Sequence, residues 1–280
     1  MVIVMQEVEA LLQIANIDLG QRGIGKVFSE AYLSKRVSLT EPARKLLEFS
    51  DDVTILVGFP IPPKGIGETD GPLGALCLAL ALEDLGINVK IVSEKSVFNA
   101  LKSLWEKTTR YTIDITKRNK VIVSIEVPGR AMDGKYYSMR GIEIFPENLD
   151  EVLFRKSEGQ ITIGIGDGGN EAGMGKIRDL IIKHIDLGEK ISSVVPADYI
   201  ITGGTSNWAA YALVGAISVM ISKNLLKKFD ENYYLRALYE SGLIDGVIGE
   251  KSMSVDGIPH AILEKMFNLI KSTVDMLINK

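Results

Sequence analysis

The fold of this 280-residue chain is decided by Val53-Thr54-Ile55-Leu56-Val57-Gly58, a short run of apolar and β-branched residues that ends at a glycine. A loop rich in proline and glycine follows, then the apolar stretch Leu73–Leu85, and then a second short run at Asn88–Val92. A short and almost wholly apolar run is typical of a strand that is buried on both faces of a parallel sheet. The order strand, helix, strand therefore predicts an α/β fold.

The same alternation continues along the chain. Short apolar runs at 121–125, 161–165 and 199–202 predict three further strands, and helical spacing of apolar residues accompanies most of them. Strands that alternate with helices in this way are joined by crossovers into a parallel sheet with helices on its faces. The sequence therefore predicts a three-layer α/β fold, a mainly parallel sheet flanked by helices, of the Rossmann-like type.

The first 50 residues differ from those that follow. Glu7–Ile17 places apolar residues at helical spacing, and Thr40 with Pro42 marks the start of a second helix. The remainder shows no repeat and no linker. We predict that residues 1–50 form a helical N-terminal extension and that residues 51–280 form a single α/β domain.

The composition excludes several classes of protein. The chain has 32 Lys and Arg against 36 Asp and Glu, a formal net charge of −4, which argues against a nucleic-acid binder with its concentrated basic face. A single cysteine excludes an internal disulfide and is typical of a cytoplasmic protein. The longest apolar runs, Leu73–Leu82 and Trp208–Ile221, are shorter than the roughly 20 residues of a membrane span, so no membrane association is expected. Homo-oligomer formation stays open.

The loops after the predicted strands are the candidate sites, because ligands of open α/β sheets bind beyond the carboxyl ends of the strands. The first loop is Gly67-Glu68-Thr69-Asp70-Gly71-Pro72, in which Thr69 or Asp70 and then Pro72 mark the start of a helix. Free N–H groups at a helix start favour an anion such as a carboxylate. The alternative interpretation is a capped loop with turn glycines and no ligand.

A second loop brings Glu126 and Arg130 to the point where the strand at 121–125 ends. Arg130 can hold a carboxylate with two parallel hydrogen bonds, as guanidinium groups do. The alternative interpretation of Arg130 is a surface ion pair.

The third loop is dense in glycine, which occupies six of the twelve positions from 164 to 175. Gly164–Gly169 formally matches the dinucleotide fingerprint GxGxxG. However, Gly164 falls within the predicted strand, and Asp167 would place a negative charge where a pyrophosphate should lie, so we expect neither NAD nor FAD to bind. An acid at this point suits an ammonium group, a metal or a proton transfer. The polar side chains of this block are Asp167, Asn170 and Glu171.

The fourth loop is Gly203-Gly204-Thr205-Ser206-Asn207, after the last predicted strand. Ser206 or Asn207 is expected to cap the helix that begins near Trp208, and the two glycines can form a backbone nest for an anion. Together the four loops offer carboxyls for an ammonium group, and an arginine and helix starts for carboxylates. This combination suits a small zwitterion that carries carboxylates, such as an acidic amino acid.

At these four loops the chain resembles the D-glutamate cyclase-like family, specifically the C-terminal domain of its longer members. The matching stretches are Gly67–Pro72, Pro128–Gly134 with Tyr137, Met139, Arg140 and Gly141, then Gly164–Lys176 and Ser206–Trp208, with a weaker match at Val255–Gly257. The resemblance runs from about Val53 to the C-terminus. It implies an enzyme, a carbon–oxygen lyase that closes D-glutamate, or a similar acidic amino acid, to 5-oxo-D-proline with loss of water.

The implied reaction assigns roles to individual residues. One acid must accept a proton from the ammonium group, and another must protonate the leaving hydroxyl. We expect Asp167 and Glu171 to form that pair, with Asp70 and Glu126 as substitutes. The sequence requires no cofactor, although a divalent metal on Asp70 and Asp167 would be an alternative polariser. The residues expected to bind substrate are Gly67, Glu68, Thr69, Gly71, Arg130, Gly168, Gly169, Asn170, Ser206 and Asn207.

Two other functions fit the same residues. A non-catalytic module that binds an acidic amino acid and regulates a partner would bind D-glutamate without turning it over. A nucleotide or phosphate enzyme that uses Gly164–Gly169 in the usual way would bind NAD, FAD or ATP.

Overall fold

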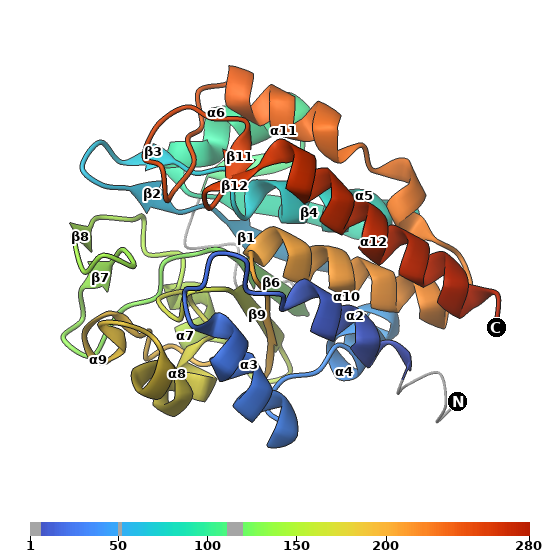
Figure 1. Cartoon of the computed structure of the whole chain (residues 1–280), viewed down its shortest axis with the longest axis horizontal. Coiled ribbons are helices and arrows are strands. Elements are labelled where there is room, and N and C mark those ends of the chain that lie inside the picture. The colour runs from blue at the N-terminus through green and yellow to red at the C-terminus, as the bar shows by residue number, and fades with distance from the viewer. Residues whose placement is uncertain (1–6, 50–51, 111–119) are drawn as a thin grey trace.

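A single parallel sheet of six strands lies at the centre of the protein, with the strand order β10-β9-β6-β1-β4-β5 (Figure 1). The computed structural model describes residues 7–49, 52–110 and 120–280. The strands are β1 Asp52–Val57, β4 Asn88–Ser93, β5 Thr108–Arg110, β6 Val121–Ile125, β9 Ile161–Gly166 and β10 Tyr199–Thr202. Every neighbouring pair in this sheet is parallel. The predicted parallel sheet is therefore confirmed.

Helices flank the sheet and complete a three-layer α/β fold, as predicted. They are α2 Glu9–Ala15, α3 Ile24–Leu33, α4 Thr40–Glu48, α5 Pro72–Glu83, α6 Lys95–Leu104, α7 Glu151–Phe154, α8 Arg178–His184, α9 Gly188–Ile191, α10 Ser206–Met220, α11 Glu231–Glu240 and α12 His260–Ile278. Three short antiparallel pairs decorate the loops: β2 Pro60–Ile61 with β3 Ile66–Gly67, β7 Tyr136–Tyr137 with β8 Glu143–Ile144, and β11 Ser254–Val255 with β12 Ile258–Pro259. None of the helices in the described ranges combines the length and the apolar character that a bilayer span requires.

The strand order reverses between β1 and β6. From β1 the chain moves outward through β4 to β5, and from β6 it moves outward in the other direction through β9 to β10. In open α/β sheets, the crevice beyond the carboxyl ends of the strands at such a reversal is the usual ligand site. The loops after β1, β6 and β9 therefore converge on one place.

The helices α5 and α10 pack against each other and against the sheet. Every side chain of α10 from Ser206 to Val219 is buried, and so is nearly all of α5, which explains why both segments are apolar all round. Figure 1 shows α2, α10 and α12 lying side by side, in agreement with their mutual contacts. Both α5 and α10 are thus internal elements of the fold.

The N-terminal helices α2, α3 and α4 are present, and the segment after α2 is attached to the carboxyl end of β10. Asn16 Nδ2 donates a 2.8 Å hydrogen bond to the Thr202 carbonyl, and Thr202 Oγ1 donates one of 2.8 Å to Asn16 Oδ1. The Gly204 N–H donates to the Ala15 carbonyl at 2.7 Å. The division of the chain at residue 50 stays a prediction, but this network places the N-terminal segment beside the loop that follows β10.

A buried carboxyl in α11 makes stability depend on pH. Burial raises the pKa of Glu231 from 4.5 to about 7, because it disfavours the charged form. A raised folded pKa contributes stability that is fully present below the unfolded pKa and is lost as pH rises through about 7. At about 1.4 kcal/mol per pKa unit, the contribution is roughly 3 kcal/mol. We expect Glu231→Gln to flatten the fall in Tm between acidic and mildly alkaline pH, measured by differential scanning fluorimetry.

The matched control is Glu240→Gln, at the exposed end of the same helix. It should leave the pH dependence of Tm as in the wild type. A Glu231→Gln variant with the wild-type pH dependence would show that Glu231 does not titrate in this range.

Candidate functional site

A cavity of about 380 Å³ lies beyond the carboxyl ends of the central strands. Its lining comes from the loops after β1, β6 and β9, from the N-terminal segment, from the β7–β8 hairpin and from the region that precedes α12. The residues that line it are Gln21, Arg22, Phe59, Ile61, Pro62, Glu68, Glu126, Ser138, Met139, Arg140, Ile142, Asp167, Asn170, Ile185, Asp186, Gly246, Val247, Gly249 and Asp256. The structure thus brings three of the four predicted loops to one cavity.

Four of the predicted site residues line this cavity directly: Glu68, Glu126, Asp167 and Asn170. All four are buried, with exposed fractions of 6% or less. Asn170 donates a hydrogen bond from Nδ2 to the Tyr137 carbonyl, whereas its Oδ1 is buried without a hydrogen-bond partner in the described part of the chain. An acceptor left free beside a cavity suits a ligand that carries an N–H or O–H donor.

Asp167 is the central acid of the cavity. It follows directly after β9, and its carboxylate accepts a hydrogen bond from Arg22 Nη2. Burial raises its pKa to about 8, and the Arg22 guanidinium opposes that rise. A carboxyl with such a pKa can exchange a proton with an amine or a hydroxyl near neutral pH.

Glu126 is held in an unusual backbone conformation at the end of β6. Its φ angle is +48°, which is rare for a residue with a side chain, and its Oε2 accepts a 2.6 Å hydrogen bond from Ser206 Oγ. Gly71 packs against it so closely that a Cβ atom on Gly71 would lie 2.7 Å from the Glu126 Cβ. Burial and the surrounding carboxyls raise the Glu126 pKa well above its usual range, which favours the protonated form of this side chain.

Asp70 and Asn207 cap each other's helices behind the cavity. The two Asp70 carboxylate oxygens accept hydrogen bonds from the Ser206 and Asn207 N–H groups at the start of α10, at 2.8 and 3.0 Å. Asn207 Oδ1 in turn accepts from the Gly71 and Gly74 N–H groups at the start of α5, at 3.0 and 2.8 Å. This exchange ties α5 to α10 and directs the polar atoms of Asn207 to the backbone.

The cap of α10 differs from the expectation. Thr205, not Ser206 or Asn207, accepts the capping hydrogen bond, from the Trp208 N–H at 3.1 Å. The Ser206 hydroxyl is consequently available to Glu126. The first turn of α10 therefore organises two of the acids.

Glu171 shapes the glycine-rich loop. Its Oε1 accepts the Gly168 N–H at 2.7 Å and the Asp167 N–H at 3.3 Å, and its Oε2 accepts the Gly169 N–H at 2.7 Å. Gly169 has a φ angle of +96°, and a Cβ there would lie 2.4 Å from the Ile181 side chain, so only glycine fits. Glu171 is thus directed at the loop backbone that presents Asp167.

The same loop departs from a dinucleotide fingerprint. In that fingerprint the third glycine opens a helix whose N-terminus meets the pyrophosphate. Here Gly164 lies within β9, and the helix α8 begins only at Arg178. The glycines of this loop allow close packing, as between Gly164 and Gly173, where an added Cβ on Gly164 would lie 2.8 Å from the Gly173 Cα.

Arg130 does not line the cavity. Its guanidinium forms ion pairs with Asp150, at 2.8 Å, and with Glu151, and it stacks over the Phe154 ring at 5.2 Å. The Arg130 side chain is therefore engaged in ion pairs, as in the alternative interpretation, but one partner, Asp150, is buried and so the pair is not a surface one. The remaining predicted substrate-binding residues, which lie around the cavity without lining it, are Gly67, Thr69, Gly71, Gly168, Gly169, Ser206 and Asn207.

Six further polar residues that line the cavity were not among the predicted site residues: Gln21, Arg22, Ser138, Arg140, Asp186 and Asp256. Arg140, on the β7–β8 hairpin, donates a 2.6 Å hydrogen bond to the Val247 carbonyl and has no carboxylate partner within the described ranges. Asp256 sits in the β11–β12 turn with a φ angle of +54°. Arg140 and Asp256 lie in stretches that match the family, which was the available sequence signal, whereas Arg22 lies before the start of the stated resemblance at about Val53.

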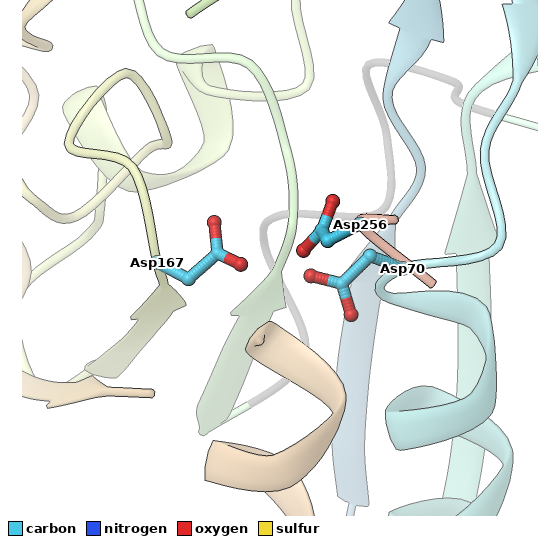
Figure 2. A group of neighbouring side chains, drawn as sticks. All are labelled: Asp70, Asp167 and Asp256. Atoms are coloured by element: carbon cyan, nitrogen blue, oxygen red, sulfur yellow. The ribbon is translucent and has the colours of Figure 1, made fainter. Parts of the chain in front are cut away.

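Two groups of carboxyls have oxygens within 4.8 Å of one another: Asp70, Asp167 and Asp256, and Glu126, Asp167 and Glu171. Figure 2 shows the first group facing one another from three separate segments. Such oxygen sets are of the kind that hard divalent cations prefer. However, Arg22 Nη2 already bonds to Asp167 and Asp256, and Asp70 already accepts two N–H groups. The carboxyls of Asp70, Asp167 and Asp256 therefore already accept hydrogen bonds from N–H groups of the protein.

The chain is similar to several known proteins. The mitochondrial D-glutamate cyclase of Homo sapiens is 29% identical to this chain over an alignment that covers 91% of the chain and 49% of that protein. The chain thus spans about half the length of this relative. Solved structures show a remote likeness: an exopolyphosphatase-related protein from Bacteroides fragilis (10% identity, TM-score 0.45, 85% of this chain and 56% of that one). RecJ from Thermus thermophilus, in complex with Mn²⁺, is also similar (12% identity, TM-score 0.37, 72% of this chain and 23% of that one).

The model of the D-glutamate cyclase-like C-terminal domain matches residues 11–271. The match begins within the N-terminal helices, well before the predicted boundary at residue 51, and so includes Arg22. Because this match covers nearly the whole chain, the protein belongs to the D-glutamate cyclase-like family.

Proposed function

We propose that the protein is a lyase that cyclises D-glutamate to 5-oxo-D-proline in the cavity lined by Asp167 and Glu126. One observation carries the proposal: four buried carboxyls with raised pKa values, Asp167 and Glu126 among them, line one cavity at the reversal of the strand order. The name of the human relative, D-glutamate cyclase, supports the choice of reaction. The substrate class is an acidic amino acid.

The charges of the cavity give the substrate one orientation. The ammonium group is attracted to the buried acids and to the free Asn170 Oδ1. A substrate carboxylate is attracted to Arg140, since its guanidinium has no carboxylate partner in the described structure and faces the cavity. The folded conformer that places the amine beside the side-chain carboxyl supplies much of the rate enhancement.

The reaction then needs three proton transfers. Asp167 takes one proton from the ammonium group, and the free amine attacks the side-chain carboxyl carbon, which forms the C–N bond. The bonded nitrogen passes a second proton to a carboxyl oxygen, which becomes a hydroxyl. That hydroxyl takes a proton from Glu126, the C–O bond breaks, and water departs. Asp167 as base and Glu126 as acid replace the expected pair, because Glu171 serves the loop backbone and Asp70 serves the start of α10.

The test is product formation from D-glutamate by the purified chain, followed by ¹³C NMR of the side-chain carboxyl carbon. D-Aspartate is the matched control, because it carries the same charges but is one methylene too short to close a five-membered lactam. We expect the lactam signal from D-glutamate and none from D-aspartate. Binding of D-glutamate without any lactam would favour a binding module, and the absence of both would refute the proposal.

Arg140 and Arg130 form a matched pair for substrate recognition. We expect Arg140→Ala to weaken D-glutamate binding by about 10- to 100-fold, since a charge-assisted hydrogen bond is worth roughly 1.5–3 kcal/mol. Arg130→Ala should leave the affinity within about twofold of the wild type, because its partners are Asp150 and Glu151. Titration calorimetry measures both. If Arg130→Ala weakened D-glutamate binding more than Arg140→Ala, Arg130 would be the residue that binds the substrate carboxylate.

A further inference from the structure

Arg22 joins segments that are far apart in the sequence. It lies in the turn between α2 and α3, and its Nη2 donates to Asp167 Oδ2, to Asp256 Oδ2 at 2.9 Å and to the Gly204 carbonyl at 3.2 Å. These partners belong to the loops after β9 and β10 and to the β11–β12 turn. A single guanidinium nitrogen therefore connects two walls of the cavity, at Asp167 and Asp256, with the loop after β10.

The backbone around Arg22 is fixed by its own contacts. Asp18 Oδ1 accepts the Arg22 N–H, and Asp18 Oδ2 accepts the Gly23 N–H, both at 3.0 Å. Gly23 has a φ angle of +95°, and a Cβ there would lie 2.5 Å from the His184 carbonyl oxygen, so no larger residue fits. These contacts fix the turn in a conformation that directs the Arg22 side chain toward the cavity.

The ionisable side chains around Arg22 are mostly acidic. Six buried carboxyls line or back the cavity: Glu68, Asp70, Glu126, Asp167, Glu171 and Asp256. Among the described residues that line it, the basic ones are Arg22 and Arg140, and Arg140 is exposed. Carboxyls packed this closely cannot all ionise unless a cation lies among them.

We propose that Arg22 is the resident counter-ion of the Asp70, Asp167 and Asp256 group, and that its guanidinium occupies the position a divalent cation would otherwise take. The acidic oxygens of this group lie within 4.8 Å of one another, and Arg22 Nη2 bonds to two of the three residues. Arg22 is accordingly a positioning residue: it holds Asp167 and Asp256 together through charge. This inference does not depend on the reaction proposed above.

The experiment measures Mn²⁺ binding by titration calorimetry, with no substrate present. Arg22→Met removes the charge but keeps much of the side-chain length. We expect it to bind Mn²⁺ at least about tenfold more tightly than the wild type, because a positive charge near the ion is removed. Arg22→Met combined with Asp256→Asn should lose that gain. Arg36→Met is the control, because Arg36 pairs with the exposed Asp179 outside the cavity, and it should bind as the wild type does.

A second neutral variant guards against misfolding. Arg22→Gln keeps an N–H donor for one carboxylate, and it should show the same gain in Mn²⁺ affinity, while Arg22→Lys, which keeps the charge, should not. Circular dichroism confirms the fold of each variant before titration. Equal Mn²⁺ affinity in the wild type and the folded neutral variants would overturn the proposal, as would an equal gain in Arg36→Met.

Discussion

Asp167→Asn is expected to lower the turnover of D-glutamate by about 100- to 10,000-fold, the usual contribution of a proton-transferring side chain. The amide nearly preserves the shape of the carboxyl but cannot accept the ammonium proton. It also keeps an oxygen that can accept the hydrogen bond of Arg22, so the loop after β9 should hold its position. The measurement is kcat for lactam formation.

The control for this variant is Asp179→Asn, which removes an exposed acid that pairs with Arg36. It should leave kcat close to the wild-type value. If Asp167→Asn kept a near-normal kcat with an unchanged Tm, Asp167 would not be the base, and Glu126 or Glu68 would become the candidates.

Glu171→Ala is expected to reduce the free energy of unfolding by about 3 kcal/mol or more. The carboxylate accepts the N–H groups of Asp167, Gly168 and Gly169, and removing it leaves three buried donors unpaired. Each hydrogen bond to a charged group is worth roughly 1.5–3 kcal/mol, although losses within one network are not additive. Urea denaturation measures the change.

Glu171→Gln separates loop support from catalysis. The amide retains one acceptor oxygen but presents an NH₂ group to the remaining N–H donors, so an intermediate loss of stability is expected. A Glu171→Ala variant that is as stable as the wild type yet inactive would contradict the loop-shaping role and would restore Glu171 as a member of the catalytic pair.

Five of the six strands could be predicted from the sequence because they are short and mostly buried. The edge strand β5 was not predicted, because its three residues are polar and Arg110 is exposed. Strands β6 and β10 lie at the predicted positions, and β1, β4 and β9 differ from their predictions by one residue. The loop that presents Asp167 could also be predicted, since the block 164–175 combines many glycines with acids. The structure gives several of these residues packing and hydrogen-bonding roles, as at Gly169 and Glu171, which the sequence did not indicate. Periodicity and local composition are properties of a short stretch of sequence, so they can be interpreted without knowledge of the tertiary structure.

The parts that sequence reasoning missed depend on contacts between distant residues. Arg22 forms ion pairs with Asp167 and Asp256, which are far from it in the sequence. No local sequence pattern predicts these contacts. Arg130 looked like a carboxylate anchor, but Asp150 and Glu151, about twenty residues later, supply its partners. In the sequence, any arginine beside a turn looks like a residue that could bind a carboxylate. The fold determines which acidic residue is its nearest partner.

The different roles of the acids could not be predicted from the sequence for the same reason. Glu171 and Asp167 are four residues apart and look equivalent in the sequence. In the fold, the oxygens of Glu171 are directed at backbone N–H groups, whereas Asp167 lines the cavity. Which carboxyl faces a ligand is thus set by the hydrogen bonds of the turn between them.

A crystal structure of the Asp167→Asn variant soaked with D-glutamate would show whether the substrate binds in this cavity, since a slow variant retains its substrate. We expect electron density for one molecule in the cavity, with the ammonium group beside Glu126, Asn170 and the substituted side chain at position 167, and with a carboxylate on Arg140. Density at another face of the protein, or a carboxylate held by Arg130 instead, would contradict the assignment of this cavity as the site.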